Sequence, residues 1–415
     1  MQGASEAERP TRVAIVLSGG GARGAYEAGV LSYLFEHIYP QLRPEFEFDI
    51  VSGTSVGAIH AGYIAASADQ THRARARDLV EIWSSMALDD VLQLSARDLF
   101  GVPLRALGIE ALVRGRREGA APELVGGLVD ISPLERLVEE RIPWSGLRGN
   151  IAAGRPRAVC VSCTDIDTGL VTVFIDGEPM DTSAWDGDRY AQAIRAEITS
   201  RHVRASAAIP FLFPAVRIGD RYYLDGGLRV NTPLSPALRL GADKVLVIGL
   251  KCAPSAEKVA PHAERAITQP AFLLGKMLNV LILDQIEHEL RRVDTINTLL
   301  EAASDALGSG CISMINDAIR GKRGLEYRKV DTVVVRPSRD LGAIAADAYR
   351  RRSRESRSRG VMARMLARLS LHGVPDEEAD LFSYLYFDAS YTRPLVDLGR
   401  ADARDQEEEI LRLLS

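Results

Sequence analysis

Two stretches near the start of the chain share one plan: residues 12–31 read RVAIVLSGGGARGAYEAGVL, and residues 48–62 read FDIVSGTSVGAIHAG. Each passes from a short apolar, β-branched segment through a glycine turn into small residues at helical spacing. The first apolar segment is too short and too apolar for anything but a buried strand. Repeated strand–turn–helix units predict an α/β protein with a parallel sheet between helices.

The second turn contains Gly53-Thr54-Ser55-Val56-Gly57, a G-x-S-x-G pattern placed directly between a predicted strand and a predicted helix. This is the setting of a nucleophile elbow, in which a serine on a strained turn exposes its hydroxyl. Larger side chains than glycine at positions 53 and 57 would collide across the bend. The helix that follows favours negative charge near the Ser55 hydroxyl. A structural turn serine is the alternative, and the flanking elements favour a nucleophile.

The first turn reads GGGARG at residues 19–24 and has two interpretations. It satisfies G-x-G-x-x-G, the dinucleotide-binding pattern of a nicotinamide-dependent oxidoreductase. That pattern needs a carboxylate after the second strand, but Glu45 and Glu47 precede the strand and Asp49 lies within it. In the hydrolase interpretation, free N–H groups of the loop form an oxyanion hole. Arg23 then either supports the loop by hydrogen bonds to nearby carbonyl groups or lies in solvent.

A serine nucleophile needs a base, and none of the seven histidines sits in a glycine-bounded loop after a strand. His60 lies on the helix that follows Ser55 and is expected to point away from it. Asp225 stands in the turn Asp225-Gly226-Gly227, at the end of a predicted hairpin strand. Aspartate is a weak base in water, but a partly dry pocket destabilises its charge and makes proton transfer less unfavourable. A plain turn aspartate is the alternative.

These three motifs, in this order, resemble those of the patatin-like phospholipases. Residues 205–214 (ASAAIPFLFP) and 231–234 (NTPL) are also similar to that family, and the resemblance covers residues 13–249. Residues 380–391 (DLFSYLYFDASY) are similar to extensions of bacterial members.

The resemblance implies a serine–aspartate dyad of Ser55 and Asp225, which hydrolyses acyl esters of phospholipids or other lipids through an acyl-serine. Such a reaction requires no metal or cofactor, and we expect no nucleic-acid partner. The resemblance also implies a three-layer α/β/α fold with a mostly parallel central sheet and a helical C-terminal extension. The expected oxyanion-hole residues are Gly19, Gly20, Gly21, Ala22, Arg23, Gly24 and Val56. Acyl transfer by the same nucleophile and a non-catalytic interaction protein on the same fold remain alternatives.

Composition narrows the class of protein further. A net charge of −5 gives no general attraction to nucleic acid, and four cysteines in 415 residues do not make a disulfide framework. Cys160 and Cys163 form a C-x-x-C, but residues three apart on a strand point to opposite faces.

The polar start lacks a secretory signal and no apolar run reaches the roughly 18 residues of a membrane span. These features predict a cytoplasmic protein.

We expect a disordered N-terminus at residues 1–11, a catalytic domain at 12–250, and a mostly helical region at 251–415 that returns one strand, near 331–336, to the sheet. Residues 271–283 are apolar nearly all round, which fits either a membrane-docking or lid helix or a buried core helix; flanking charges of both signs favour the core helix. Six arginines between positions 350 and 359 would attract anionic headgroups, unless they form a solvated segment. Transient contact with a membrane surface is therefore a prediction, and the oligomeric state is open.

Two local patterns complete the expectations. Ser132-Pro133-Leu134-Glu135 is typical of a capping box at a helix start. Residues 191–209 are helix-like and end at Pro210.

Overall fold

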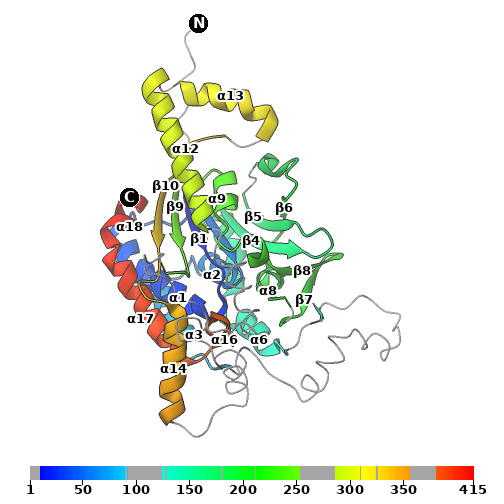
Figure 1. Cartoon of the computed structure of the whole chain (residues 1–415), viewed down its shortest axis with the longest axis vertical. Coiled ribbons are helices and arrows are strands. Elements are labelled where there is room, and N and C mark those ends of the chain that lie inside the picture. Colours follow the sequence, from blue (N-terminus) through cyan, green and yellow to red (C-terminus); the bar gives the residue numbers. More distant parts are fainter. Residues whose placement is uncertain are drawn as a thin grey trace, which may run out of the picture.

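The computed structural model describes residues 10–88, 91, 124–126, 129–178, 181–210, 212–252, 286–308, 310–323, 326–355 and 380–415. Within this part of the chain, ten strands form one sheet with helices packed on both faces (Figure 1). The prediction of an α/β fold with a mostly parallel central sheet and a helical C-terminal region is confirmed.

Five neighbouring strands run parallel, in the spatial order β10-β9-β1-β2-β4. Their sequences are nearly continuous apolar runs because both faces of the sheet are covered. In β1, Ile15 and Leu17 face one core, whereas Ala14 and Val16 face the other. The five strands are β1 (Val13–Leu17), β2 (Ile50–Thr54), β4 (Ala158–Asp165), β9 (Lys244–Ile248) and β10 (Asp331–Val335). The strand expected near residues 331–336 thus forms as β10.

Beyond β4 the strands are no longer all parallel. One edge of β4 pairs along its length with β5, and the other edge is shared by two strands. On that shared edge, Thr54 of β2 lies opposite Ser162, and Asp225 of β8 lies opposite the next residue, Cys163. The end of β2 and the end of β8 are therefore neighbours. The remaining strands are β3 (Leu124–Val125), β5 (Val171–Gly177), β6 (Ala191–Arg195), β7 (Ala215–Ile218) and β8 (Arg221–Asp225).

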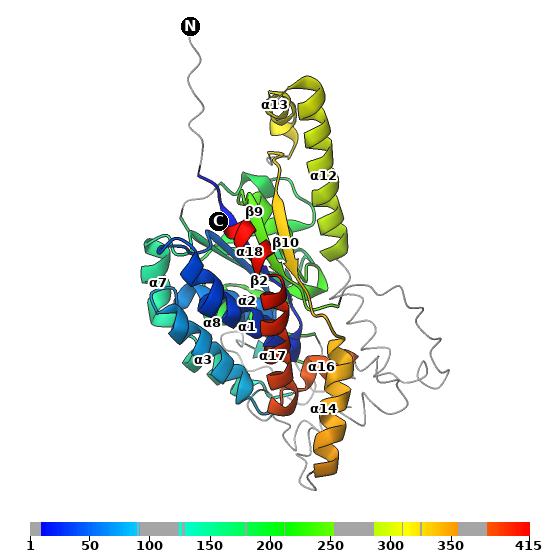
Figure 2. The same cartoon turned by 90° about the vertical axis from the view of Figure 1, so that its left-hand side faces the viewer.

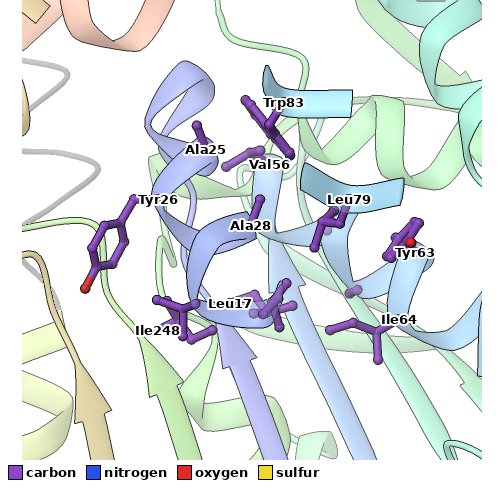
Figure 3. Close-up of a cluster of buried hydrophobic side chains, with 14 of the residues drawn as sticks. Leu17, Ala25, Tyr26, Ala28, Val56, Tyr63, Ile64, Leu79, Trp83 and Ile248 are labelled. Carbon is purple, nitrogen blue, oxygen red and sulfur yellow. The ribbon is translucent and has the colours of Figure 1, made fainter. Parts of the chain in front are cut away.

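One face of the sheet carries most of the helices. Figure 3 shows Leu17 and Ile248, at the ends of β1 and β9, below Ala28 of α1. Leu79 and Trp83 of α3 belong to the same buried cluster. The helices on or beyond this face are α1 (Gly24–Tyr33), α2 (Val56–Ala66), α3 (His72–Ser84), α6 (Ser132–Arg141), α7 (Trp144–Ala152), α8 (Ser200–Ser206), α14 (Leu341–Glu355), α16 (Asp380–Leu385), α17 (Ala389–Asp405) and α18 (Glu407–Leu414). Short single-turn segments are η1 (Gly21–Arg23), η2 (Leu34–Ile38), η3 (Tyr39–Gln41), η5 (Ser183–Trp185) and η6 (Gly226–Leu228).

The opposite face is covered more sparsely, by α9 (Leu234–Arg239) and by α12 (Ile286–Leu307). Leu234 and Val293 pack there with the inner residues of β1 and β9. In Figure 2, α12 rises along one side of the molecule and meets α13 (Cys311–Arg323) at its far end.

The C-terminal helices belong to the same body as the sheet. Gly29 of α1 and Gly399 of α17 let the two helices touch through their backbones, because a β-carbon at either position would collide with the other helix's main chain. Ile410 and Leu413 of α18 are buried in the larger core, beside β9 and β10. The C-terminal helix thus docks on the body of the protein. The predicted domain boundaries stay a prediction.

Two local predictions are wrong. Residues 191–209 are not one helix: β6 pairs with β5, and α8 begins only at Ser200. The hydrogen bonds between β6 and β5 outweigh the helical pattern of these residues.

The second wrong prediction concerns the start of α6. Ser132 is the first residue of α6 rather than its N-cap, and its N–H and hydroxyl both donate to Asp130.

Some predictions lie outside the described residues: the N-terminal disorder of residues 1–9, the apolar segment 271–283 and the arginine run beyond residue 355. Of that run, Arg351 and Arg352 are exposed on α14, whereas Arg350 is half-buried. None of the helices in the described ranges combines the length and the apolar character needed to span a bilayer.

Candidate active site

Ser55 stands between β2 and α2 with φ of 57°, alone among the described non-glycine residues in having positive φ. This backbone conformation is strained for a residue with a β-carbon. The surrounding glycines make the bend possible: a β-carbon on Gly53 would collide with the carbonyl oxygen of Gly57, and one on Gly57 with that of Leu17. The glycine spacing recognised in the sequence is therefore a packing requirement of the elbow.

A buried serine from α8 holds the elbow in place. The Ser55 N–H donates to Ser206 Oγ at 2.9 Å, and the Ser206 hydroxyl donates to the Ser162 carbonyl at 2.6 Å. Ser206 is fully buried. It therefore links the strained turn to β4, in the central sheet.

The structure brings Ser55 and Asp225 together. Ser55 Oγ donates to Asp225 Oδ2 at 2.7 Å, and both residues are at most 5% exposed. The other carboxylate oxygen accepts the Gly227 N–H at 2.7 Å, while Thr164 Oγ1 donates to the Asp225 carbonyl. Gly226 allows the tight turn, since a β-carbon there would collide with the backbone of β4. The carboxylate is thus fixed in orientation by the turn that follows it.

Burial changes the acidity of this carboxylate. Desolvation raises the pKa of Asp225 to about 6, against the opposing effect of its hydrogen bonds from Ser55 and Gly227. A carboxylate with a higher pKa is a stronger base once ionised. Asp225 is therefore a better proton acceptor at neutral pH than a solvated aspartate.

The glycine loop offers fewer free donors than the sequence predicted. In the described part of the chain, the N–H groups of Gly20, Gly21, Ala22 and Val56 have no hydrogen-bond acceptor. The Gly19 N–H donates to the Asn231 carbonyl at 3.0 Å.

The N–H groups of Arg23 and Gly24 close the η1 turn. The N–H groups of Gly19, Arg23 and Gly24 are thus bonded within the protein, and the assignment of the loop as an oxyanion hole stays a prediction.

Asn231 and the C-terminal segment support this loop. Asn231 Nδ2 donates to the Gly19 carbonyl at 3.1 Å, so two hydrogen bonds join these residues. Arg23 is buried; its Nε donates to Ser383 Oγ at 2.8 Å and its guanidinium lies 4.4 Å from the centre of the Tyr384 ring. Arg23 therefore does support the loop, by a hydrogen bond to the side chain of a residue distant in sequence. The family resemblance singles out residues 231–234 and 380–391, but it does not specify these contacts.

His60 has a structural role, as predicted. Its Nδ1 lies 2.5 Å from Glu27 Oε2, and its Nε2 accepts the indole N–H of Trp83 at 2.9 Å. Because an indole can only donate, Nδ1 carries the proton and Glu27 accepts it. Glu27 also accepts the Ser18 N–H, just before the glycine loop. The histidine is thus bonded on both sides and does not contact Asp225.

An apolar cavity of about 60 Å³ opens beside Ser55. Gly21, Ser55 and Val56 form part of its lining, so the cavity meets the glycine loop and the elbow. Its apolar walls include Ile59, Leu79, Trp83, Leu134, Phe213 and Phe387. Sequence reasoning did not find these residues, because they are ordinary core residues in pattern. A larger cavity of about 190 Å³ lies between α9 and α12 and is lined by neither Ser55 nor Asp225.

The two cysteines of the C-x-x-C pattern and the aspartate Asp165 at the end of β4 serve the fold. Cys160 and Cys163 are free, buried and packed in different cores, on opposite faces of β4 as predicted. Asp165 accepts the N–H groups of Asp167 and Thr168 and so closes a turn. The described residues contain no group of three ligating side chains that could hold a metal ion.

Two of the three carboxylates considered for a dinucleotide site are also engaged in the fold. Glu47 pairs with the buried Arg75, and Asp49 accepts the Val13 N–H. The element that follows β2 is the serine elbow.

The sequence model described as Patatin-like phospholipase matches residues 15–238, more than half of the 415 residues. The chain belongs to the patatin-like phospholipase family. The matched range contains the glycine loop, Ser55 and Asp225.

Individual relatives are more distant. The Escherichia coli (strain K12) protein named "Uncharacterized protein YjjU" is 28% identical over 244 residues, which is 58% of this chain. The aligned part spans 52% of that relative, about half of its length.

Among solved structures, human GIVD cytosolic phospholipase A2 in complex with methyl γ-linolenyl fluorophosphonate has a TM-score of 0.39 and 13% identity, covering 97% of this chain and 58% of that one. VipD from Legionella pneumophila has a TM-score of 0.30 and 14% identity, covering 94% of this chain and 67% of that one.

Proposed function

We propose that this protein is a lipid acyl hydrolase that cleaves carboxylic esters, with Ser55 as nucleophile and Asp225 as base. The observation that carries this proposal is the 2.7 Å hydrogen bond from Ser55 Oγ to a buried carboxylate, at a strained elbow beside an apolar cavity. A turn serine of purely structural role would have no reason to hold a strained backbone conformation next to such a base.

The first half of the reaction forms an acyl-serine. Asp225 accepts the Ser55 proton as Oγ attacks the ester carbonyl carbon. The carbonyl oxygen becomes an oxyanion, stabilised by the unbonded N–H groups of Gly20, Gly21 and Val56, to which Ala22 adds a further donor. The tetrahedral intermediate collapses, its bond to the alcohol oxygen breaks, and the alcohol leaves with the proton from Asp225.

The second half returns the enzyme. A water molecule attacks the acyl-serine carbonyl and gives one proton to Asp225, and the same N–H groups stabilise the second oxyanion. Collapse breaks the bond to Ser55 Oγ, which recovers the proton as the fatty acid leaves. All proton transfers use the one carboxylate, so these steps need neither a histidine nor a metal.

The substrate class follows from the cavity and the family. An apolar cavity that begins at the nucleophile suits an acyl chain, because burial of each methylene group contributes about 0.8 kcal/mol. We propose phospholipids or other acyl esters as substrates, with transient contact of the protein with the lipid surface that holds them.

The experiment compares ester turnover by the wild type, Ser55→Ala and Asp225→Ala with a p-nitrophenyl acyl ester. Each variant is expected to lose at least about 10³-fold in kcat, since both groups act in the same proton transfer. Two buried residues away from the dyad serve as matched controls: Ser32→Ala on α1 and Asp165→Asn on β4. Undiminished turnover in Ser55→Ala or Asp225→Ala contradicts the proposal.

Product analysis with added glycerol or lysophospholipid separates hydrolysis from acyl transfer. Free fatty acid as the main product supports the hydrolase. A new glycerol ester or diacyl phospholipid as the main product would instead assign acyl transfer to the same nucleophile.

A further inference from the structure

The segment of residues 380–392 lies far outside the family match at 15–238, yet it packs directly on the candidate active site. Ser383 Oγ accepts the hydrogen bond of Arg23 Nε at 2.8 Å. The carbonyl oxygen of Tyr384 lies so close to Gly21 that a β-carbon on this glycine would collide with it. The C-terminal segment is therefore in contact with the loop that carries the free N–H groups.

The same segment supplies one wall of the cavity beside Ser55. Phe387 lines that cavity and is 7% exposed. Its ring stacks against that of Trp83, with a centroid distance of 6.4 Å and an interplanar angle of 23°. Thr392 Oγ1 donates to the Trp83 carbonyl at 2.6 Å, which holds the start of α17 against the end of α3. The stack on Trp83 and the hydrogen bond that joins the two helices thus hold the Phe387 ring against the end of α3.

We propose that the C-terminal segment is part of the active site and that Phe387 is a specificity-determining residue, which limits the length of the acyl chain. This inference rests on the proposed function, because it assigns the cavity to the acyl group of an ester. The cavity of about 60 Å³ offers room for roughly four to six water molecules. A wall that leaves so little space favours a short chain over a long one, and removal of the ring enlarges the space.

The chain contains a matched control for this residue. Phe382 lies five positions earlier, on α16, and is fully buried. Its ring stacks on Tyr386 at 4.5 Å and packs against Tyr349, and it does not line the cavity. Loss of either phenylalanine ring removes a similar amount of core packing, but only loss of the Phe387 ring changes the shape of the cavity.

The test measures kcat/KM for p-nitrophenyl octanoate and p-nitrophenyl butyrate, and reports the ratio of the two. Phe387→Ala is expected to raise the octanoate-to-butyrate ratio about tenfold, the size of effect that a few methylene groups have in an apolar pocket. Phe387→Trp narrows the cavity and is expected to lower the ratio. Phe382→Ala, and Phe382→Leu as the match to Phe387→Leu, are expected to leave the ratio unchanged.

Equal shifts in the Phe382 and Phe387 variants, or no shift in the Phe387 variants, overturn the inference. Should Phe387→Ala fail to fold, Phe387→Leu and Phe387→Trp test the same claim with smaller changes in volume. A ratio is insensitive to the fraction of folded enzyme, so a purely structural role of Phe387 would lower both rates and leave the ratio as it is.

Failure of the proposed function has a different signature. A wild-type protein that cleaves neither ester and is not labelled at Ser55 by a fluorophosphonate contradicts the hydrolase itself. A labelled, active wild type with an unaltered ratio in the Phe387 variants contradicts only the role of the C-terminal wall.

Discussion

Replacement of Asp225 by asparagine is expected to abolish turnover and at the same time stabilise the fold. Asparagine has nearly the same shape: its oxygen can accept the Gly227 N–H and its amide group can donate to Ser55 Oγ. The substitution therefore removes the base and the negative charge while it keeps two hydrogen bonds. Loss of a buried charge is favourable for folding, whereas loss of the base stops proton transfer.

The magnitude follows from the acidity of the carboxyl group. Burial raises the pKa of Asp225 from its ordinary 3.8 to about 6, a difference that corresponds to about 3 kcal/mol between its two protonation states. Because folding raises this pKa, the Asp225 carboxyl group contributes fully to the free energy of unfolding below pH of about 4, where it is protonated. That contribution is lost as the pH rises through about 6 and the group ionises in the folded protein. Asp225→Asn should therefore match the wild type at low pH and exceed its free energy of unfolding by about 3 kcal/mol at pH of about 8.

Urea denaturation followed by tryptophan fluorescence, at a series of pH values from about 4 to about 8, measures this difference, and a p-nitrophenyl ester assay measures turnover. Asp165→Asn is the control. Burial raises the pKa of Asp165, but hydrogen bonds from Arg221 and from the N–H groups of Thr168 and Asp167 outweigh it and lower that pKa. The control should therefore lose stability at neutral pH. A stability difference for Asp225→Asn that does not grow with pH, or retained turnover, refutes the reasoning.

Three further predictions concern the same site. The wild-type kcat/KM for a p-nitrophenyl ester should fall about tenfold per pH unit below about 6, because Asp225 must be ionised to accept a proton; a profile flat to pH of about 4.5 would argue against this base. Gly57→Ala should prevent formation of the elbow, since its methyl group would collide with the Leu17 carbonyl; folded, active protein in circular dichroism and turnover would contradict this. Ser206→Ala removes the acceptor of the Ser55 N–H and should lower kcat about tenfold, with little change in KM. Steady-state kinetics measure both constants, and Ser32→Ala is the control.

The features that the sequence predicted are those whose physical cause is local. The turn at Ser55 has no room for side chains at two fixed positions, so Gly53 and Gly57 mark the elbow in this sequence. Continuous apolar runs mark the buried strands, including β10, about 80 residues beyond β9. For the same reason, the alternation along β4 placed Cys160 and Cys163 on opposite faces.

The meeting of Ser55 with Asp225 has a cause that is not local. Thr54 and Asp225 lie opposite consecutive residues on the same edge of β4. That register depends on how β8 enters the sheet, which no pattern within either motif specifies. From the sequence alone, only the resemblance to the family's order of motifs predicted that Ser55 and Asp225 act together.

Which N–H groups of the glycine loop are free could not be predicted from the motif alone. The Gly19 N–H is bonded to the carbonyl of Asn231, more than 200 residues away in sequence. The Arg23 and Gly24 N–H groups instead close the single turn η1, a local conformation that the glycine pattern does not specify. The strand β6 was missed for a related reason. Its residues are only half-buried and carry no strict alternation, and pairing with β5 decides their conformation.

The central claim is that an acyl group is transferred to Ser55 during turnover. Its most direct test mixes the protein with p-nitrophenyl butyrate, quenches the reaction in acid within the first turnovers, and locates the acyl group by peptide mass spectrometry. The account predicts a butyryl group on the peptide that contains Ser55, absent in Ser55→Ala and strongly reduced in Asp225→Asn. A butyryl group on a different residue, or continued turnover by Ser55→Ala, would contradict it.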